Sequence, residues 1–144
     1  MATTTDWNQK IIAEFRANGG RVARFGHQPL LLLHHRGARS GIERVNPLAY
    51  QELEKGYAVF ASKGGAPTNP DWYHNLRANP RVRVEVGTHM IGVVARVPDS
   101  EERERIWEKQ KRLNPAFAEY EGKTARTIPV LILERTTNQT AATG

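Results

Sequence analysis

The chain has 144 residues, of which 39% are hydrophobic, and it contains no cysteine. This length suits one domain that buries its own core, and the lack of cysteine excludes disulfides, thiol nucleophiles and cysteine-bound metal sites. The formal net charge of +6, from 21 basic and 15 acidic residues, favours an anionic ligand, a nucleic acid or an anionic lipid surface as partner.

The first predicted element is a helix that begins near Asp6, a suitable N-cap, and ends near Ala17. Its apolar side consists of residues at helical spacing: Trp7, Ile11, Ile12 and Phe15. Residues 18–29 are expected to be irregular. The polar, acidic residues 1–6 do not resemble a signal peptide, so we expect a cytoplasmic protein, with a peripheral membrane contact of this helix left open.

The rest of the chain predicts six strands, at 30–36, 44–51, 57–62, 81–86, 89–97 and 128–134. Helices are predicted at 69–78, at 99–113 and in a short piece that ends at Tyr120. Pro129 places the last strand at a sheet edge or delays its start. Because few helices separate the strands, the pattern favours a mainly β fold, a small barrel, over a doubly wound sheet. We expect a helix and loop over 1–29, the barrel over 30–135 and a disordered tail over 136–144.

One motif directly follows a predicted strand, at residues 61–76: Ala-Ser-Lys-Gly-Gly-Ala-Pro-Thr-Asn-Pro-Asp-Trp-Tyr-His-Asn-Leu. Its two glycines expose backbone amides beside Lys63, and Asn69-Pro70 begins a helix that carries Trp72 and Tyr73. Amides, a cation, a helix N-terminus and aromatic rings suit a flat ligand that bears a phosphate. The same residues are also consistent with a Gly-rich hairpin loop followed by a surface helix.

A second motif follows the apolar run at 30–33 and covers residues 37–48. Arg39 and Ser40 lie between two glycines, so the tip of a turn can offer a guanidinium and a hydroxyl to one phosphate. Arg44 begins the returning strand and can face the same groove. The alternative interpretation is a solubilising turn between two strands.

Together, Gly-x-Arg-Ser-Gly-x-x-Arg-Val-Asn-Pro-Leu at 37–48 and Ala-Ser-Lys-Gly-Gly-Ala-x-x-Asn-Pro-x-Trp-Tyr-x-Asn-Leu at 61–76 resemble the deazaflavin-dependent nitroreductase family. The resemblance extends from about residue 30 to 134, and Arg-Thr-Ile-Pro-Val at 126–130 also fits. It implies a split β-barrel related to flavin-nucleotide oxidases. It also implies the 8-hydroxy-5-deazaflavin coenzyme F-420 and its use in reducing quinones, enones, unsaturated lactones or nitroaromatics. Since the ring carries the hydride, no essential nucleophile is expected.

The resemblance also implies a set of cofactor-binding residues. Arg39, Ser40 and Arg44 would hold the phosphate or acidic tail, and Ser62 and Lys63 would meet the polar edge of the ring. The other implied positions shape the groove or cover its ends: Ala38, Val45, Asn46, Pro47, Leu48, Ala49, Phe60, Ala61, Gly64, Asp71, Trp72, Tyr73, His74 and Asn75.

On the acceptor side, the resemblance implies a pocket formed by Asn114, Phe117 and Tyr120, with His27 reaching it from a loop. Tyr120 and Ser62 are the candidate catalytic residues. Asn114 and Phe117 stand where nitro-reducing members carry hydroxyls, and neither side chain usefully donates a proton. This departure disfavours nitroaromatics and leaves quinones and unsaturated lactones. The first helix either closes over this pocket or simply packs on the barrel.

No metal site is expected, because His34 and His35 are neighbours on a strand and face opposite sides. Three other functions stay open: an FMN-dependent enzyme of the same barrel, a non-catalytic cofactor carrier, and a basic nucleic-acid-binding barrel. FMN is less favoured, and no known nucleic-acid-binding motif is present. We expect a small-molecule acceptor, no nucleic acid, and a monomer or homodimer.

Overall fold

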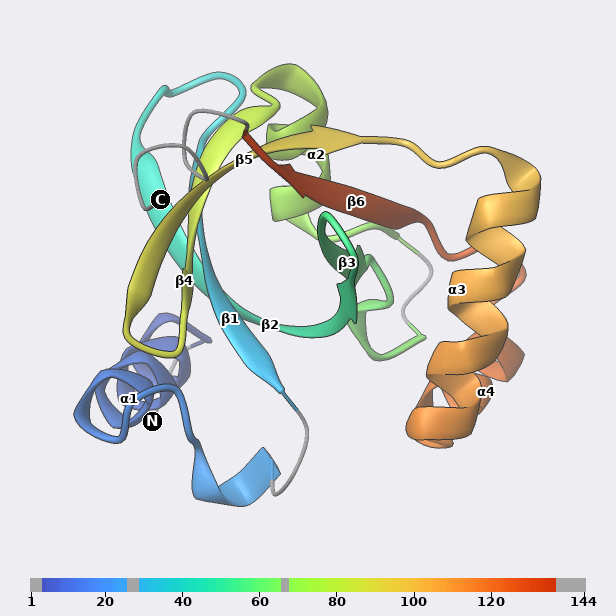
Figure 1. The fold of residues 1–144 in the computed structure, drawn as a ribbon, viewed down its shortest axis with the longest axis horizontal. Coiled ribbons are helices and arrows are strands. Elements are labelled where there is room, and N and C mark those ends of the chain that lie inside the picture. Colours follow the sequence, from blue (N-terminus) through green and yellow to red (C-terminus); the bar gives the residue numbers. More distant parts are fainter. Residues whose placement is uncertain (1–3, 26–28, 66–67, 137–144) are drawn as a thin grey trace.

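The computed structural model describes residues 4–25, 29–65 and 68–136, in which six antiparallel strands close a barrel (Figure 1). The strands follow one another around the barrel in the order β1-β2-β3-β6-β5-β4. Their bounds are β1 (Leu30–Arg36), β2 (Glu43–Leu53), β3 (Gly56–Phe60), β4 (Arg81–Val86), β5 (His89–Arg96) and β6 (Val130–Arg135). The prediction of a small, mainly β barrel is confirmed.

The start of β6 decides between the two roles predicted for Pro129. The strand begins one residue later and pairs with β3 on one side and β5 on the other. The expectation of an edge position was therefore wrong, and that of a late start was right. Proline lacks the N–H that a strand paired on both sides needs, so the ladder begins beyond it.

The helices are α1 (Thr4–Ala17), α2 (Asp71–Ala78), α3 (Ser100–Leu113) and α4 (Ala116–Lys123), with short 3-10 turns η1 (Ala23–Phe25) and η2 (Lys63–Gly65). The Asp99 carboxylate caps α3 by accepting the backbone N–H of Glu102 at 2.8 Å. Asn69 does not cap α2. Its side-chain oxygen accepts a hydrogen bond from Arg126 at 2.6 Å instead, and Pro70 precedes the helix without a side-chain cap.

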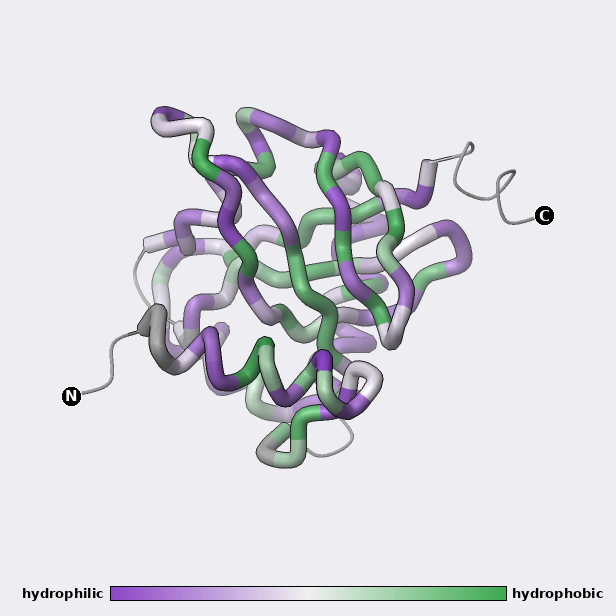
Figure 2. The backbone as a smooth tube through the Cα atoms, turned by 90° about the vertical axis from the view of Figure 1, so that its left-hand side faces the viewer, coloured by the Kyte–Doolittle hydropathy of each residue, from purple (hydrophilic) through white to green (hydrophobic). Residues whose placement is uncertain are grey.

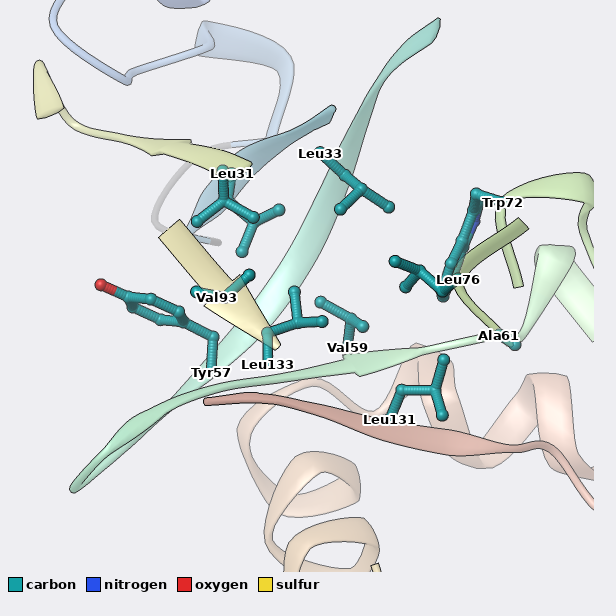
Figure 3. Close-up of a cluster of buried hydrophobic side chains, with 11 residues drawn as sticks. Leu31, Leu33, Tyr57, Val59, Ala61, Trp72, Leu76, Val93, Leu131 and Leu133 are labelled. Carbon is teal, nitrogen blue, oxygen red and sulfur yellow. The ribbon is translucent and has the colours of Figure 1, made fainter. Parts of the chain in front are cut away.

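The barrel interior is filled by a first hydrophobic cluster, drawn from alternate residues of the strands and from α2 (Figure 3). Leu31 and Leu33 of β1 face Val59 and Leu133 there. Helix α2 adds Trp72 and Leu76, which are four residues apart and therefore lie on one helix face. The cluster also contains Tyr57, Ala61, Val84, Val93 and Leu131. Helix α2 is thereby anchored to the barrel by its apolar face.

Two helical layers cover the outside of the barrel, so several strands are buried on both faces. α3 and α4 lie side by side next to β6, away from α1 (Figure 1). They form a second cluster around Trp107 and Phe117 with the outward residues of β3 and β6. α1 packs Ile11, Ile12 and Phe15 against the outward leucines of β1 in a third cluster. This double covering explains the unbroken apolar run at 30–33.

Helix α1 lies across the outside of the barrel, and hydrophilic and hydrophobic residues alternate along it (Figure 2). Trp7 does not belong to its buried side, because 44% of this residue is exposed, whereas Phe15 is fully buried. The guanidinium of Arg16 donates two hydrogen bonds to the carboxylate of Glu85 on β4, at 3.1 and 2.6 Å, and so connects the helix to the barrel. His34 contacts the same carboxylate at 2.7 Å.

None of the helices in the described ranges has the length and apolar character needed to cross a membrane. The predicted tail lies outside the described residues from 137 onward.

Candidate functional site

The two sequence motifs meet at one end of the barrel, where the β1–β2 turn, η2 and α2 come together. Two cavities lie there and share Arg44 and Asp71; we call them the inner cavity and the turn cavity, and together the groove. The inner cavity of about 650 Å³ is lined by Asn8, Gln9, His35, Glu43, Arg44, Val45, Asn46, Lys63, Pro70, Asp71 and Trp72. The turn cavity of about 440 Å³ is lined by Gly37, Ala38, Arg39, Ser40, Arg44, Asp71, His74 and Asn75.

The β1–β2 turn presents Arg39 and Ser40 at the turn cavity. The N–H of Gly37 donates to the carbonyl of Ile42 at 3.0 Å, and the N–H of Gly41 donates back to Gly37 at 2.9 Å. Gly41 has a φ of 69°, which a residue with a side chain rarely adopts. The Ser40 hydroxyl oxygen accepts the N–H of Ile42 at 3.2 Å. Its proton is left to donate to a ligand.

The η2 loop holds Lys63 in a strained backbone conformation, with a φ of 47°. Arg126 supports this loop, because its guanidinium donates to the carbonyls of Ala61 and Ser62 at 3.1 and 2.9 Å. The same guanidinium binds Asn69 at the end of the loop. Backbone strain in a non-glycine residue persists where surrounding contacts enforce it, and such residues cluster at binding sites.

The groove is rich in cationic side chains. Arg39, Arg44 and Lys63 take part in none of the ion pairs found within the described ranges. Asp71 lies in the first turn of α2. The N-terminus of this helix, which we expected to bind a negatively charged group of the ligand, therefore already carries a carboxylate. The remaining positive charge suits an anionic ligand that reaches both cavities.

A buried hydrogen-bonded chain connects the two motifs beneath the groove. The backbone N–H of Ala38 donates to the Asn75 side-chain oxygen at 2.9 Å. The Asn75 amide nitrogen lies 3.0 Å from Nδ1 of His35, and Nε2 of His35 lies 2.6 Å from the side-chain oxygen of Asn46. Burial lowers the pKa of His35, whose residue is 2% exposed. We had not predicted His35, although its place on the inward face of β1 beside Asn46 was a usable signal.

Most of the predicted cofactor-binding residues border the groove, but several do not. The predicted cofactor-binding residues that line a cavity are Ala38, Arg39, Ser40, Arg44, Val45, Asn46, Lys63, Asp71, Trp72, His74 and Asn75. Those that line neither are Pro47, Leu48, Ala49, Phe60, Ala61, Ser62 and Tyr73. Gly64 lies in the turn η2, and its surroundings are outside what the structure describes. Ala61 is buried in the first cluster and Phe60 in the second.

The residues predicted for the acceptor lie in different surroundings. Phe117 is 5% exposed and packs edge-on against two other rings. Its ring centroid lies 5.3 Å from that of Phe60 and 5.2 Å from that of Tyr120. Asn114 borders a different cavity, of about 720 Å³, between η1, β2 and the end of α3. His27 lies outside the described residues. Phe117 therefore serves the packing of α4, which in turn contacts η2.

Helix α1 both packs on the barrel and reaches the groove. Asn8 and Gln9 border the inner cavity, whereas Phe15 is buried in the third cluster. No group of three or more histidine and acidic side chains in the part of the chain that the structure describes could hold a metal ion.

Comparison with known proteins gives one consistent result. Residues 7–135 match the family described as "F420H(2)-dependent quinone reductase". A protein of Mycobacterium tuberculosis with the same description is 38% identical over 128 residues, which are 85% of this chain and 86% of that protein.

Two solved structures share both fold and sequence. One, described as an F420-H2 dependent reductase, is 44% identical with a TM-score of 0.68 and covers 74% of this chain and 94% of its own. Another, described as a domain-swapped dimer, is 39% identical with a TM-score of 0.69 and covers 92% of this chain and 100% of its own.

Proposed function

The chain belongs to the F420H(2)-dependent quinone reductase family, and we propose that it uses reduced coenzyme F-420 to reduce a small quinone. Family membership confirms the resemblance that the two motifs indicated. The observation that supports the activity is the groove itself, in which both motifs supply side chains to two adjoining cavities.

The residues of the groove fit a deazaflavin cofactor. Trp72 and Pro70 give the inner cavity apolar surface against which a flat ring can pack, and Asn46 adds a hydrogen-bonding amide. Arg39 and Arg44 supply guanidinium groups at the turn cavity, where a phosphate and an acidic tail need neutralising. The two volumes together are of the size found for cofactor sites.

When bound, the deazaflavin supplies a hydride, so the protein must bind, orient and shield it. Arg44 borders both cavities and is suited to fix the cofactor between its ring and its anionic end. Lys63, held by the strained loop, places a cation at the inner cavity, where negative charge on the ring edge can be offset. Asn8 and Gln9 of α1 border the same cavity and can donate hydrogen bonds to a quinone carbonyl.

Ser62 and Tyr120 remain candidates for binding the acceptor. Tyr120 lies in α4 and Ser62 directly precedes η2, and these two elements contact each other. Tyr120 is half-buried against Phe117, and Ser62 has its carbonyl bound by Arg126. Neither side chain borders the groove, so we propose that they act on the acceptor from beside the η2 loop rather than on the cofactor.

The activity is tested by following the anaerobic oxidation of reduced F-420 by menadione, a small quinone. The wild-type protein should accelerate the reaction, and Arg44→Ala should raise the KM for the cofactor. Lys55→Ala is the matched control, because it removes the same charge at the exposed β2–β3 turn. Binding without acceleration would instead indicate a carrier, and equal effects of the two variants would refute the role of the groove.

The assembly state and any membrane contact are separate proposals. A relative forms a domain-swapped dimer, and we propose a monomer or homodimer for this chain, to be decided by light scattering. The proposed peripheral contact of α1 can be tested by sedimentation with anionic lipid vesicles.

A further inference from the structure

We propose that His35, as a neutral imidazole, is a positioning residue that turns the amide nitrogen of Asn46 into the groove as a donor to the bound cofactor. The inference rests on the proposed use of coenzyme F-420. It concerns how the groove is prepared before the cofactor enters.

The direction of each hydrogen bond in the chain follows from the backbone N–H of Ala38, which can only donate. The backbone N–H of Ala38 donates, so the atom of Asn75 that receives it, at 2.9 Å, is the side-chain oxygen. The other end of the Asn75 amide, the NH2 group, then faces Nδ1 of His35 at 3.0 Å. An amide NH2 only donates, so Nδ1 must be an acceptor and the imidazole proton must lie on Nε2.

The same reasoning fixes Asn46. Nε2–H of His35 donates across 2.6 Å, so the Asn46 atom that faces it is the side-chain oxygen. The NH2 group of Asn46 is left without a hydrogen-bond partner among the described residues, and Asn46 is half-buried in the wall of the inner cavity. A donor held in this way meets an acceptor oxygen of the cofactor without first being reorganised.

The strand register explains why these residues meet. Arg44 pairs with His35 and Asn46 pairs with Leu33, so His35 and Asn46 are diagonal neighbours on the inward face of the barrel. Asn75 reaches the same point from α2, one residue before Leu76, which anchors that helix in the interior. His34 faces the other side and binds Glu85, so it is not part of the chain.

Protonation of His35 would break the chain. A charged imidazole directs an N–H from both nitrogens, and the one on Nδ1 would oppose the Asn75 NH2 group. Rotating Asn75 to accept it would leave the Ala38 N–H facing a donor. Three titratable or charged residues act on His35: Arg44 from β2, His34 from the preceding position of β1, and Asp71 from α2. Burial, Arg44 and His34 lower the pKa of His35, while the Asn46 hydrogen bond and Asp71 raise it. The chain therefore persists in neutral solution and fails only under acid.

The test is a double-mutant cycle on the affinity for F-420, measured by fluorescence with thermal unfolding recorded on each variant. His35→Ala and Asn46→Ala should each weaken binding by about 3- to 10-fold, the range expected for one neutral hydrogen bond. The double variant should bind no more weakly than the worse single variant. Multiplying effects would overturn the proposal, because a residue that acts through Asn46 has no effect once Asn46 is removed.

Three further readouts separate positioning from mere stability. His35→Gln retains a donor toward Asn46 and should restore most of the affinity. His34→Gln, the neighbouring buried control, should stay within about 2-fold of wild type. Because burial lowers the pKa of His35 from 6.5, the ratio of wild-type to His35→Gln affinity should hold down to that pH and fall only under more acidic conditions. A ratio that never changes down to the pH at which the protein unfolds would contradict the proposal.

A measurement without cofactor checks the tautomer directly. Nitrogen NMR of His35 in the free protein at neutral pH should show a proton on Nε2 and none on Nδ1. A proton on Nδ1 would overturn the inference whether or not F-420 binds, whereas failure of the wild-type protein to bind F-420 would refute the proposed function separately.

Discussion

Replacing Gly65 by alanine tests how tightly α4 is packed on the η2 loop. A Cβ at this position would lie 2.9 Å from Cβ of Lys123 and 3.0 Å from the carbonyl oxygen of Tyr120, and the backbone φ is +83°. The left-handed conformation costs a residue with a side chain about 1–2 kcal/mol. Overpacking against atoms that cannot swing away costs about 1–3 kcal/mol more. We therefore expect Gly65→Ala to lower the free energy of unfolding by about 2–5 kcal/mol.

Two other glycines provide matched controls. Gly41 has a similar φ, +69°, but a Cβ there would meet nothing within 4 Å, so Gly41→Ala should cost only about 1–2 kcal/mol. Gly122 lies within α4 with open space around its Cβ position, so Gly122→Ala should stabilise by about 0.5–1 kcal/mol. Urea denaturation measures all three. If Gly65→Ala cost no more than Gly41→Ala, the close packing of α4 on the loop would be refuted.

Three further outcomes are expected from other parts of the structure. The Arg16 hydrogen bond lowers the pKa of Glu85 from 4.5, so ionised Glu85 stabilises the fold above pH 4.5 and this contribution is lost as the pH falls through the lowered pKa. Glu85→Gln should thus lower the melting temperature at pH 7, and this loss should shrink as the pH is lowered below 4.5; a loss that does not change with pH would contradict this. Arg126→Lys should cost about 2–4 kcal/mol in urea denaturation, because lysine cannot bind the two carbonyls and Asn69 together. Tyr120→Phe should slow menadione reduction with little change in F-420 affinity, and a large loss of affinity would place Tyr120 in the cofactor site.

The strands could be predicted because each carries its own signal. The apolar run at 30–33 and the alternating residues of 81–86 and 89–96 mark strands whatever packs on them. The small barrel was predicted from the number of strands and the few helices between them. What the pattern could not show is which helix covers which face, because that depends on contacts between distant segments.

The sequence motifs identify residues that the structure brings to one groove, whereas contacts between residues far apart in the sequence could not be predicted. Asn69 has the usual features of a helix cap, but Arg126, 57 residues further on, takes its side-chain oxygen. Phe117 was expected at an acceptor pocket, but it packs against the rings of Phe60 and Trp107 in the second cluster. His35 was considered only as a metal ligand, and its amide partners come from β2 and α2.

The most direct test of the deazaflavin groove is a fluorescence titration of the purified protein with coenzyme F-420, beside FMN in the same buffer. We expect binding in the micromolar range or tighter for F-420 and much weaker binding for FMN. Preference for FMN would keep the barrel but contradict the deazaflavin groove, and binding of neither would leave the cations Arg39, Arg44 and Lys63 without their proposed ligand.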